Sequence, residues 1–204
     1  MNCKAKFIAI ALVGIMSVVP IKIQAEIETQ KSLEIHPSNK KGPFFIEASV
    51  RCLALNMYYE ARSQGTAGLF AVTAVVLNRV NDPRFPNTVC KVVYQGPTRE
   101  SWKTRQHKDL PASERKYYPI KNRCQFSWYC DGKNDNPHNK KRYRELLDLS
   151  EAILYNEIPF IDITDGALFY HADYVTPGWV KTKQRTAKIE DHIFYRIIFS
   201  FTCW

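Results

Sequence analysis

The residue with the clearest chemical potential is a glutamate placed where its carboxyl group would be poorly solvated. Glu60 lies three residues after Met57 and seven after Leu53, so helical spacing puts it on or beside an apolar stripe. It also falls in the last turn before Gly65, where the helix dipole disfavours a negative charge. Both effects raise the pKa of a carboxyl group, as a general acid for glycoside cleavage requires. The alternative is an ordinary helix-end glutamate that pairs with Arg62 or another cation.

Hydrophobic periodicity places Glu60 near the end of the first of three predicted helices. These helices run from about Ile46 to Gly65, from about Thr66 to Val80 and from about Lys140 to Asn156. Residues 85–95 favour a short turn followed by an apolar helix or strand. Short β-like runs follow at 167–171 and 187–201, with residues 174–183 between them. The sequence therefore predicts a single α+β domain, with a helical N-terminal part and a small C-terminal β portion.

The N-terminus has the pattern of a secretory signal peptide. Lys4 and Lys6 precede an apolar run from Phe7 to Val19, and Ala25 ends an acceptable small-residue cleavage site. The run is shorter than the ~20 residues that a membrane span needs, although an uncleaved anchor is the alternative. We expect a signal peptide over residues 1–25, a polar linker over 26–45 and the folded domain over 46–204.

The charge balance is basic throughout. The chain has a formal net charge of +9, and loss of residues 1–25 would remove three lysines and no acid, leaving +6. A basic exported domain suits an anionic surface such as a cell wall, and nucleic acid would suit it equally. Generic solubility is the third interpretation of the charge.

Five cysteines follow the predicted signal peptide, and in an oxidising compartment four of them can form two bridges. They are Cys52, Cys90, Cys124, Cys130 and Cys203. Four cysteines allow three pairings, and the sequence does not choose among them. We expect Cys203, the penultimate residue, to be the free one.

Other common catalytic chemistries find little support in the sequence. His171 and His192 do not fit a zinc signature, and no two cysteines have CxxC spacing. A GxSxG elbow and a phosphate-binding glycine loop are also absent from the sequence. We therefore expect no metal and no cofactor.

Several blocks of sequence, taken in order, resemble the SleB-type cell wall hydrolases, the spore-cortex-lytic family. The blocks are residues 56–62, 68–72, 76–80, 85–95, 124–132, 166–171, 177–179 and 189–195. They cover roughly residues 50–196. One block alone is a weak match, but the ordered set is specific.

This resemblance implies a lysozyme-like fold related to lytic transglycosylases, and a catalytic domain over residues 46–204. It implies cleavage of the β-1,4 bond between N-acetylmuramic acid and N-acetylglucosamine, and it puts the family's catalytic glutamate at Glu60. A lytic transglycosylase needs only that residue, because the muramic acid C6 hydroxyl attacks C1 and leaves a 1,6-anhydro product. A hydrolase needs a second carboxylate about 5 to 10 Å away, and Asp131, Asp173 and Glu190 are the candidates.

An aromatic block between Cys124 and Cys130 suits sugar binding, because aromatic faces stack on the apolar faces of sugars. The alternative for each aromatic residue is ordinary core packing, and for Asn78 it is a helix-end cap. Arg79 is expected to be structural or to contact the wall. The predicted substrate-binding residues are Asn78, Gln125, Phe126, Trp128, Asp131, Tyr170, His171 and Trp179.

A basic stretch from Pro97 to Arg123 departs from the family pattern. It is rich in turn residues and is predicted to be a long surface insertion, either a solvated loop or a contact for anionic wall polymers. The leading hypothesis for the chain is an exported enzyme, periplasmic or secreted, whose partner is the peptidoglycan glycan strand. Its rivals are a muramidase, a glycan-binding module without catalysis, and a basic nucleic-acid-binding or partner-binding protein. We expect no nucleic acid and no membrane contact beyond the signal segment, and oligomeric state stays open.

Overall fold

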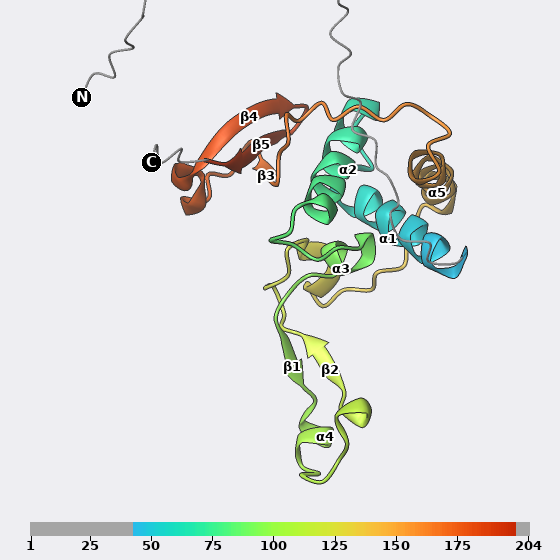
Figure 1. Ribbon diagram of the computed structural model, residues 1–204, viewed down its shortest axis with the longest axis vertical. Helices are drawn as coiled ribbons and strands as arrows, with labels where there is room; N and C mark the ends of the chain where they lie inside the picture. Colours follow the sequence, from blue (N-terminus) through green and yellow to red (C-terminus); the bar gives the residue numbers. More distant parts are fainter. Residues whose placement is uncertain (1–42, 199–204) are drawn as a thin grey trace, which may run out of the picture. The chain divides into compact units, whose positions relative to one another are not determined.

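The computed structural model describes residues 43–198, with side chains from residue 47 onward. Its helices are α1 (Pro43–Ala61), α2 (Thr66–Asn81), α3 (Val89–Val93), α4 (Trp102–Arg105) and α5 (Lys140–Leu154). Its strands are β1 (Thr98–Glu100), β2 (Tyr117–Pro119), β3 (Phe169–Ala172), β4 (Lys183–Ile189) and β5 (His192–Ile197). Short 3-10 helices are η1 (Ala112–Glu114), η2 (Ser127–Cys130) and η3 (Gly178–Thr182). The order, with three long helices and then a small sheet, confirms the predicted α+β class (Figure 1).

The main core lies where α1 packs against α2, α3 and α5. Leu53 and Met57 on α1, one helical turn apart, are fully buried, as are Val72 and Val76 on α2. Burying each side chain of this size contributes about 1.5–3 kcal/mol. These contacts fix the C-terminal end of α1, which carries Glu60.

Several local signals set the helix ends. Asn139 caps α5 by accepting a hydrogen bond from the backbone amide of Arg142, and Thr88 caps α3 in the same way. Helix α2 ends at Asn81, two residues before Pro83, which cannot continue a helix. The predicted limits of α2 are thus confirmed within one residue, while α1 begins at Pro43, about three residues earlier than expected.

The C-terminal sheet is antiparallel with strand order β3-β5-β4, and Figure 1 shows it beside α2. Ala167 and Phe194 pack on Ala71 and Val75 of α2 to form a second, smaller core. The prediction of one continuous run over 187–201 was wrong, because a turn at Glu190 and Asp191 separates β4 from β5. Glu190 adopts a positive φ of 47°, a conformation that apolar periodicity cannot signal.

The turn between β4 and β5 also fastens the sheet to α2. The carboxylate of Glu190 accepts hydrogen bonds from the backbone amides of Gly65, at 2.9 Å, and Gly68, at 3.1 Å. A carboxylate at a helix N-terminus satisfies free amides and complements the helix dipole. A Cβ atom at Gly68 would collide with the Gln64 side chain and lie 3.0 Å from the Glu190 carboxylate, so this close approach favours glycine.

Between residues 43 and 198 there are two disulfides, Cys52–Cys90 and Cys124–Cys130. The first ties α1 to α3, and the second closes the segment that precedes and includes η2. One of the three pairings that the sequence allowed is therefore realised. Cys203, the predicted signal peptide and most of the predicted linker lie outside the described residues.

The basic stretch of residues 96–123 is not a featureless loop. Strands β1 and β2 pair antiparallel, with Arg99 opposite Tyr118 and Glu100 opposite Tyr117. The sequence missed this ribbon because its strands have only three residues each and no apolar alternation. Among residues 43–198, none of the helices has the length and apolar character to cross a membrane.

Candidate active site

Glu60 lies in the last turn of α1, half-buried, with a phenol directed at its carboxyl group. The Tyr170 hydroxyl donates a hydrogen bond to Glu60 Oε2 at 2.9 Å. Burial raises the pKa of Glu60, and the hydrogen bond from Tyr170 opposes that rise. Within the described residues Glu60 forms no salt bridge, and Arg62 instead lies over the Tyr58 ring at 4.9 Å. The alternative of a surface pair with Arg62 is therefore wrong.

Tyr170 reaches Glu60 from β3, across the space between the helical core and the sheet. Burial raises the pKa of Tyr170 well above its ordinary value, and the neighbouring carboxyl group adds to this rise. The phenol is thus neutral at physiological pH and acts as a hydrogen-bond donor. Its ring packs edge-on against His192, with centroids 4.9 Å apart, and against Phe194.

Glu60 and Tyr170 face a cavity of about 390 Å³. Its walls come from the end of α1, from α2, from the segment around η2, and from β3 with the loop after it. The lining residues are Tyr59, Glu60, Arg79, Gln125, Phe126, Ser127, Trp128, Tyr170, His171, Ala172, Tyr174 and His192. Among the residues described, Glu60 is the only carboxylate in this lining. A cavity of this size is large enough for one or two sugar rings.

A buried cation forms part of the same cavity. Arg79 on α2 is only 4% exposed, and its Nε donates to the Leu168 carbonyl at 2.8 Å. Its guanidinium lies over the rings of Phe85, Phe126 and Phe169 at 5.1 to 5.6 Å. Burial lowers the pKa of Arg79 to about 10, so the side chain stays protonated at neutral pH. The Nη1 atom has no hydrogen-bond partner in the described part of the chain.

Two histidines close the sheet side of the cavity. Burial lowers the pKa of His192, so this ring is neutral at physiological pH, and its Nδ1 lies 3.1 Å from Gln64 Nε2. His171 Nε2 is 3.0 Å from the Tyr195 hydroxyl. In the described residues no cluster of three or more histidine, cysteine or acidic side chains could hold a metal ion.

The aromatic side of the cavity, formed by Tyr59 and Trp128, is anchored by the buried amide of Asn56. Trp128 stacks on Tyr59 with ring centroids 4.8 Å apart, and its indole Nε1 donates to Asn56 Oδ1 at 3.2 Å. Phe126 and Trp128 are both buried, so each exposes little of its ring to the cavity. Tyr174, in contrast, is 86% exposed at the cavity rim and presents its ring to solvent.

The structure brings together six of the nine residues predicted for the site. These are Glu60, Gln125, Phe126, Trp128, Tyr170 and His171. Trp179 lies apart from the cavity and packs on His171, Phe169 and Tyr195. Asp131 also lies outside the lining, where it accepts a hydrogen bond from the Lys133 amide.

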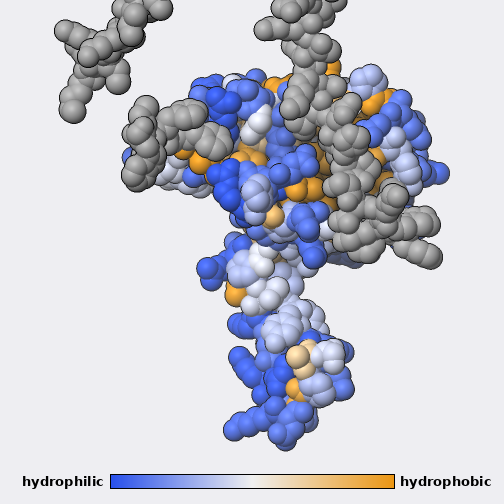
Figure 2. All heavy atoms as spheres, viewed as in Figure 1, coloured by the Kyte–Doolittle hydropathy of each residue, from blue (hydrophilic) through white to orange (hydrophobic). Residues whose placement is uncertain are grey.

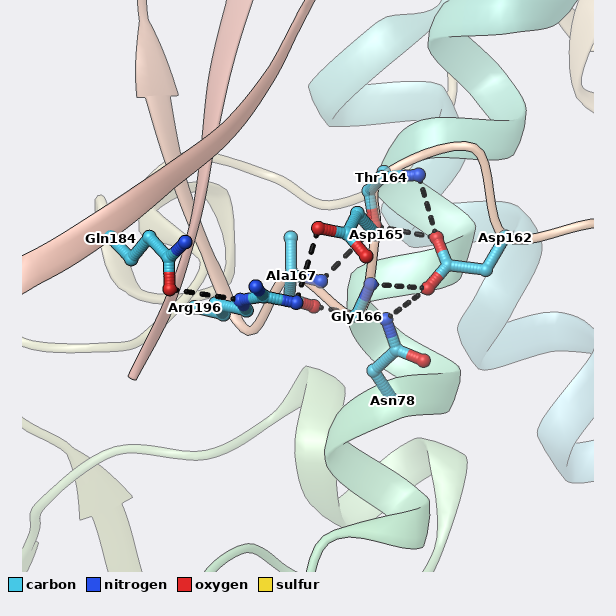
Figure 3. Close-up of polar contacts among 8 residues, drawn as sticks. All are labelled: Asn78, Asp162, Thr164, Asp165, Gly166, Ala167, Gln184 and Arg196. Atoms are coloured by element: carbon cyan, nitrogen blue, oxygen red, sulfur yellow. Dashed lines mark hydrogen bonds and ion pairs between the residues drawn. The ribbon is translucent and has the colours of Figure 1, made fainter. Parts of the chain in front are cut away.

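Asn78 is the third predicted residue outside the cavity, and its amide is engaged in the fold. It donates to Asp162 Oδ2 at 2.8 Å and to the Ala167 carbonyl at 3.1 Å. Figure 3 shows the Asp162 carboxylate accepting hydrogen bonds from the Asn78 amide and from the backbone amides of Thr164 and Gly166. This network fastens the loop before β3 to α2, and so it sets where β3 carries Tyr170.

The candidates for a second carboxylate are engaged elsewhere. Glu190 caps α2, and Asp173 pairs with Lys188 at 2.9 Å. Neither of these residues, nor Asp131, lines the cavity with Glu60.

Sequence reasoning missed several residues of the cavity, of which Arg79 and His192 are the most buried. Arg79 lies three residues after Val76 and seven after Val72, both fully buried on α2. This is the same spacing that singled out Glu60, so the signal for Arg79 was present. His192 was weighed only as a metal ligand, and its role in the cavity depends on a strand pairing that the sequence does not show.

Comparison with known proteins identifies the relatives of this chain. The profile of the cell wall hydrolase family matches residues 63–195. The spore cortex-lytic enzyme of Bacillus subtilis (strain 168) is 43% identical over 151 residues, which cover 74% of this chain and 38% of that protein. The corresponding enzyme of Oceanobacillus iheyensis is 27% identical over 159 residues, covering 78% and 45%. This chain therefore spans less than half the length of these two relatives.

Among solved structures, two catalytic domains are similar at 27% identity. The catalytic domain of the germination-specific lytic transglycosylase SleB from Bacillus anthracis aligns with a TM-score of 0.47, over 78% of this chain and 98% of that one. The catalytic domain of the Bacillus cereus SleB protein aligns with a TM-score of 0.44, over 72% and 89%. The family match begins at residue 63, so Glu60 lies three residues before it, and the case for that residue rests on the geometry of the cavity.

Proposed function

This chain belongs to the cell wall hydrolase family, and from that premise we propose that it cleaves peptidoglycan glycan strands as a lytic transglycosylase, with Glu60 as acid and then base. The bond cut is the β-1,4 link from N-acetylmuramic acid to N-acetylglucosamine. The observation that carries the proposal is that Glu60 alone supplies a carboxylate to the cavity walls as described, and that burial raises its pKa.

The first step requires a neutral acid beside the glycosidic oxygen. Neutral Glu60 donates its proton to that oxygen as the bond to C1 breaks, and an oxocarbenium-like state forms on the muramyl ring. The N-acetylglucosamine fragment leaves as an alcohol. Glu60 is now ionised in a poorly solvated place, where the hydrogen bond from Tyr170 stabilises the anion.

The second step needs a base and no second carboxylate. The C6 hydroxyl of the same muramyl residue attacks C1, and ionised Glu60 accepts the hydroxyl proton. One C–O bond has broken and one has formed, the enzyme regains its proton, and no water is consumed. The product carries a 1,6-anhydromuramyl end.

The alternative, a hydrolytic muramidase, needs a carboxylate that activates water about 5 to 10 Å from Glu60. The three candidates for that role hold other partners outside the cavity. A further alternative is a binding module of the same fold that has lost catalysis. The buried carboxyl and its phenol donor count against it, because a binding module gains nothing from a desolvated acid.

The proposed site of action is the cell wall, outside the cytoplasm, either in the periplasm or after secretion. Two disulfides support this proposal, since such bridges persist in oxidising compartments. The signal peptide over residues 1–25 belongs to the same proposal.

Mass spectrometry of soluble fragments released from purified sacculi tests the reaction. We expect 1,6-anhydromuramyl ends from the wild-type protein, and a rate lower by about 100- to 10,000-fold for Glu60→Gln. Asp131→Asn is the matched control and should keep its activity. Reducing muramic ends would identify a hydrolase instead, and full activity of a folded Glu60→Gln variant would remove Glu60 from the mechanism.

A further inference from the structure

Residues 96–123, here called the arm, leave the fold after α3 and return just before η2. Figure 1 shows the paired strands β1 and β2 extending away from the helices, with α4 at the far end. The arm tip carries its own concavity of about 530 Å³, lined by residues 106–111 and separate from the cavity at Glu60. The catalytic proposal makes no use of any of this surface.

The arm is internally organised around one arginine. Arg115 pairs with Glu100 at 2.8 Å, and it also donates to the carbonyl groups of Leu110, at 3.1 Å, and Lys108, at 2.9 Å. The Ser101 amide adds a backbone hydrogen bond of 2.7 Å to the Lys116 carbonyl. These contacts hold the tip against the ribbon, so the arm presents a defined surface.

That surface is strongly basic. Residues 97–123 contain eight basic and three acidic side chains, so this short segment carries five of the nine net positive charges of the whole sequence. Only Arg115 among the eight forms an ion pair within the described part of the chain. Figure 2 shows the arm as mostly hydrophilic. The exposed basic residues are Arg99, Lys103, Arg105, Lys108, Lys116, Lys121 and Arg123.

Aromatic rings stand among these charges. Trp102 is 58% exposed, and Tyr117 and Tyr118 are exposed to a similar degree. Register places Tyr118 directly opposite Arg99, so a ring and a cation share one face of the ribbon. Exposed rings next to cations suit a ligand that combines flat apolar faces with anionic groups.

The base of the arm is continuous with the wall of the Glu60 cavity. The Gln125 amide donates to the Gln95 carbonyl at 2.8 Å, which closes the arm at its root. Gly96 packs against Cys124, where a Cβ atom would lie 3.0 Å from the Cys124 Cα. The next residues along the chain, from Gln125 to Trp128, line the cavity. A polymer held in the cavity therefore starts beside the root of the arm.

We propose that the arm binds the carboxylate-bearing stem peptides of the glycan strand whose sugars enter the Glu60 cavity. This inference rests on the proposed function. The stem peptides hang from the muramyl residues and carry free carboxylates, which complement the unpaired lysines and arginines of the arm. The arm thus makes the enzyme prefer glycan strands that still carry peptides over strands that have been stripped of them.

The test compares binding of two glycan preparations by the full chain in a Glu60→Gln background, so that no substrate is consumed. The probes are soluble glycan strands with stem peptides and the same strands after an amidase has removed the peptides. The arm variant is Lys103→Glu/Arg105→Glu/Lys108→Glu. Its control is Lys140→Glu/Lys141→Glu/Arg144→Glu, an equal charge change at exposed positions of α5.

We expect the arm variant to bind peptide-bearing strands about tenfold or more weakly at low salt, with a difference that shrinks as salt rises. The α5 control should change by less than about twofold. Peptide-free strands keep one lactyl carboxylate on each muramyl residue, so their binding should fall far less in the arm variant than the binding of peptide-bearing strands. With Glu60 restored, the arm variant should cleave short peptide-free strands at the wild-type rate.

Equal binding by the arm variant and the α5 control would overturn the proposal, as would equal binding of both glycan preparations by the parent. Arm-dependent binding of a single-stranded oligonucleotide, without preference for stem peptides, would also overturn it and assign the surface to nucleic acid. The two proposals can fail separately. Arm-dependent binding without cleavage by the wild type would reject only the proposed transglycosylase activity. Cleavage by the wild type with binding that does not depend on the arm would reject only the proposed binding role of the arm.

Discussion

Replacing Tyr170 with phenylalanine removes one oxygen from the site and leaves the aromatic packing on His192 and Phe194. The lost hydrogen bond is the 2.9 Å contact that favours the ionised form of Glu60. A hydrogen bond to a charged group contributes about 1.5–3 kcal/mol. Because this hydrogen bond lowers the pKa of Glu60, Tyr170→Phe should raise that pKa further.

The direction of the pH effect follows from which form of Glu60 reacts. In the proposed mechanism the neutral acid protonates the glycosidic oxygen, so kcat/KM should decline as the pH rises through the pKa of Glu60. A higher pKa moves this alkaline limb to higher pH. The plateau value should fall at the same time by about 10- to 150-fold, because the anion left after proton transfer loses its donor.

The assay is a pH profile of kcat/KM on a soluble glycan oligomer, with product ends counted by mass spectrometry. Tyr143→Phe is the control, since Tyr143 is a half-buried tyrosine of α5 that lies outside the cavity. An alkaline limb that stays in place with an undiminished plateau would refute the assigned role of Tyr170. A limb that moves to lower pH would show that the phenol stabilises the neutral acid instead.

Three further results are expected. Folding raises the pKa of Glu60, so the contribution of Glu60 to stability is full at acidic pH and is lost as the pH rises through that pKa. Glu60→Gln should therefore have a higher melting temperature than the wild type at pH 7–8, by roughly 2–4 °C for each kcal/mol gained. Below about pH 4 the two proteins should melt at the same temperature. Cys52→Ser/Cys90→Ser opens a bridge between residues 38 apart and should lower the free energy of unfolding by about 4 kcal/mol in urea titrations. Asn78→Ala leaves Asp162 short of a donor and should cost about 1–3 kcal/mol in the same titration, with a lower kcat as β3 loosens. An unchanged melting temperature of Glu60→Gln at pH 7–8 would contradict the raised pKa of Glu60. An unchanged urea midpoint would contradict the stabilising role given to the disulfide, and an unchanged kcat of Asn78→Ala would contradict the link from Asn78 to β3.

Sequence reasoning reached the helical part of the fold and the centre of the site. The limits of α2 were found because buried valines recur along it and Pro83 follows it. Glu60 was singled out because its spacing puts a carboxyl group beside apolar residues, and burial does raise its pKa. The limits of α2 depend on patterns within one helix, which a sequence displays directly, whereas the catalytic role of Glu60 was predicted from the resemblance to the SleB-type family.

The parts that escaped depend on contacts between distant residues. The turn between β4 and β5 falls within an apolar stretch and gives no sequence signal, because Glu190, which has a positive φ there, is held by the backbone amides of Gly65 and Gly68, 125 and 122 residues earlier in the chain. Asn78 was placed among the sugar-binding residues because nothing in the sequence links it to Asp162. The cavity itself forms only when the C-terminal sheet packs against α2, which brings Tyr170 within 2.9 Å of a residue 110 positions earlier.

The closed root of the arm has a consequence for how such a chain can vary. The arm starts and finishes at the hydrogen bond between Gln95 and Gln125, with the Cys124–Cys130 bridge just beyond it. Two chain ends that already meet can be joined by a short turn, so we expect the chain to tolerate shortening or exchange of this segment. The arm is in this sense a separable segment, which can vary in sequence and length while the residues that line the Glu60 cavity stay the same.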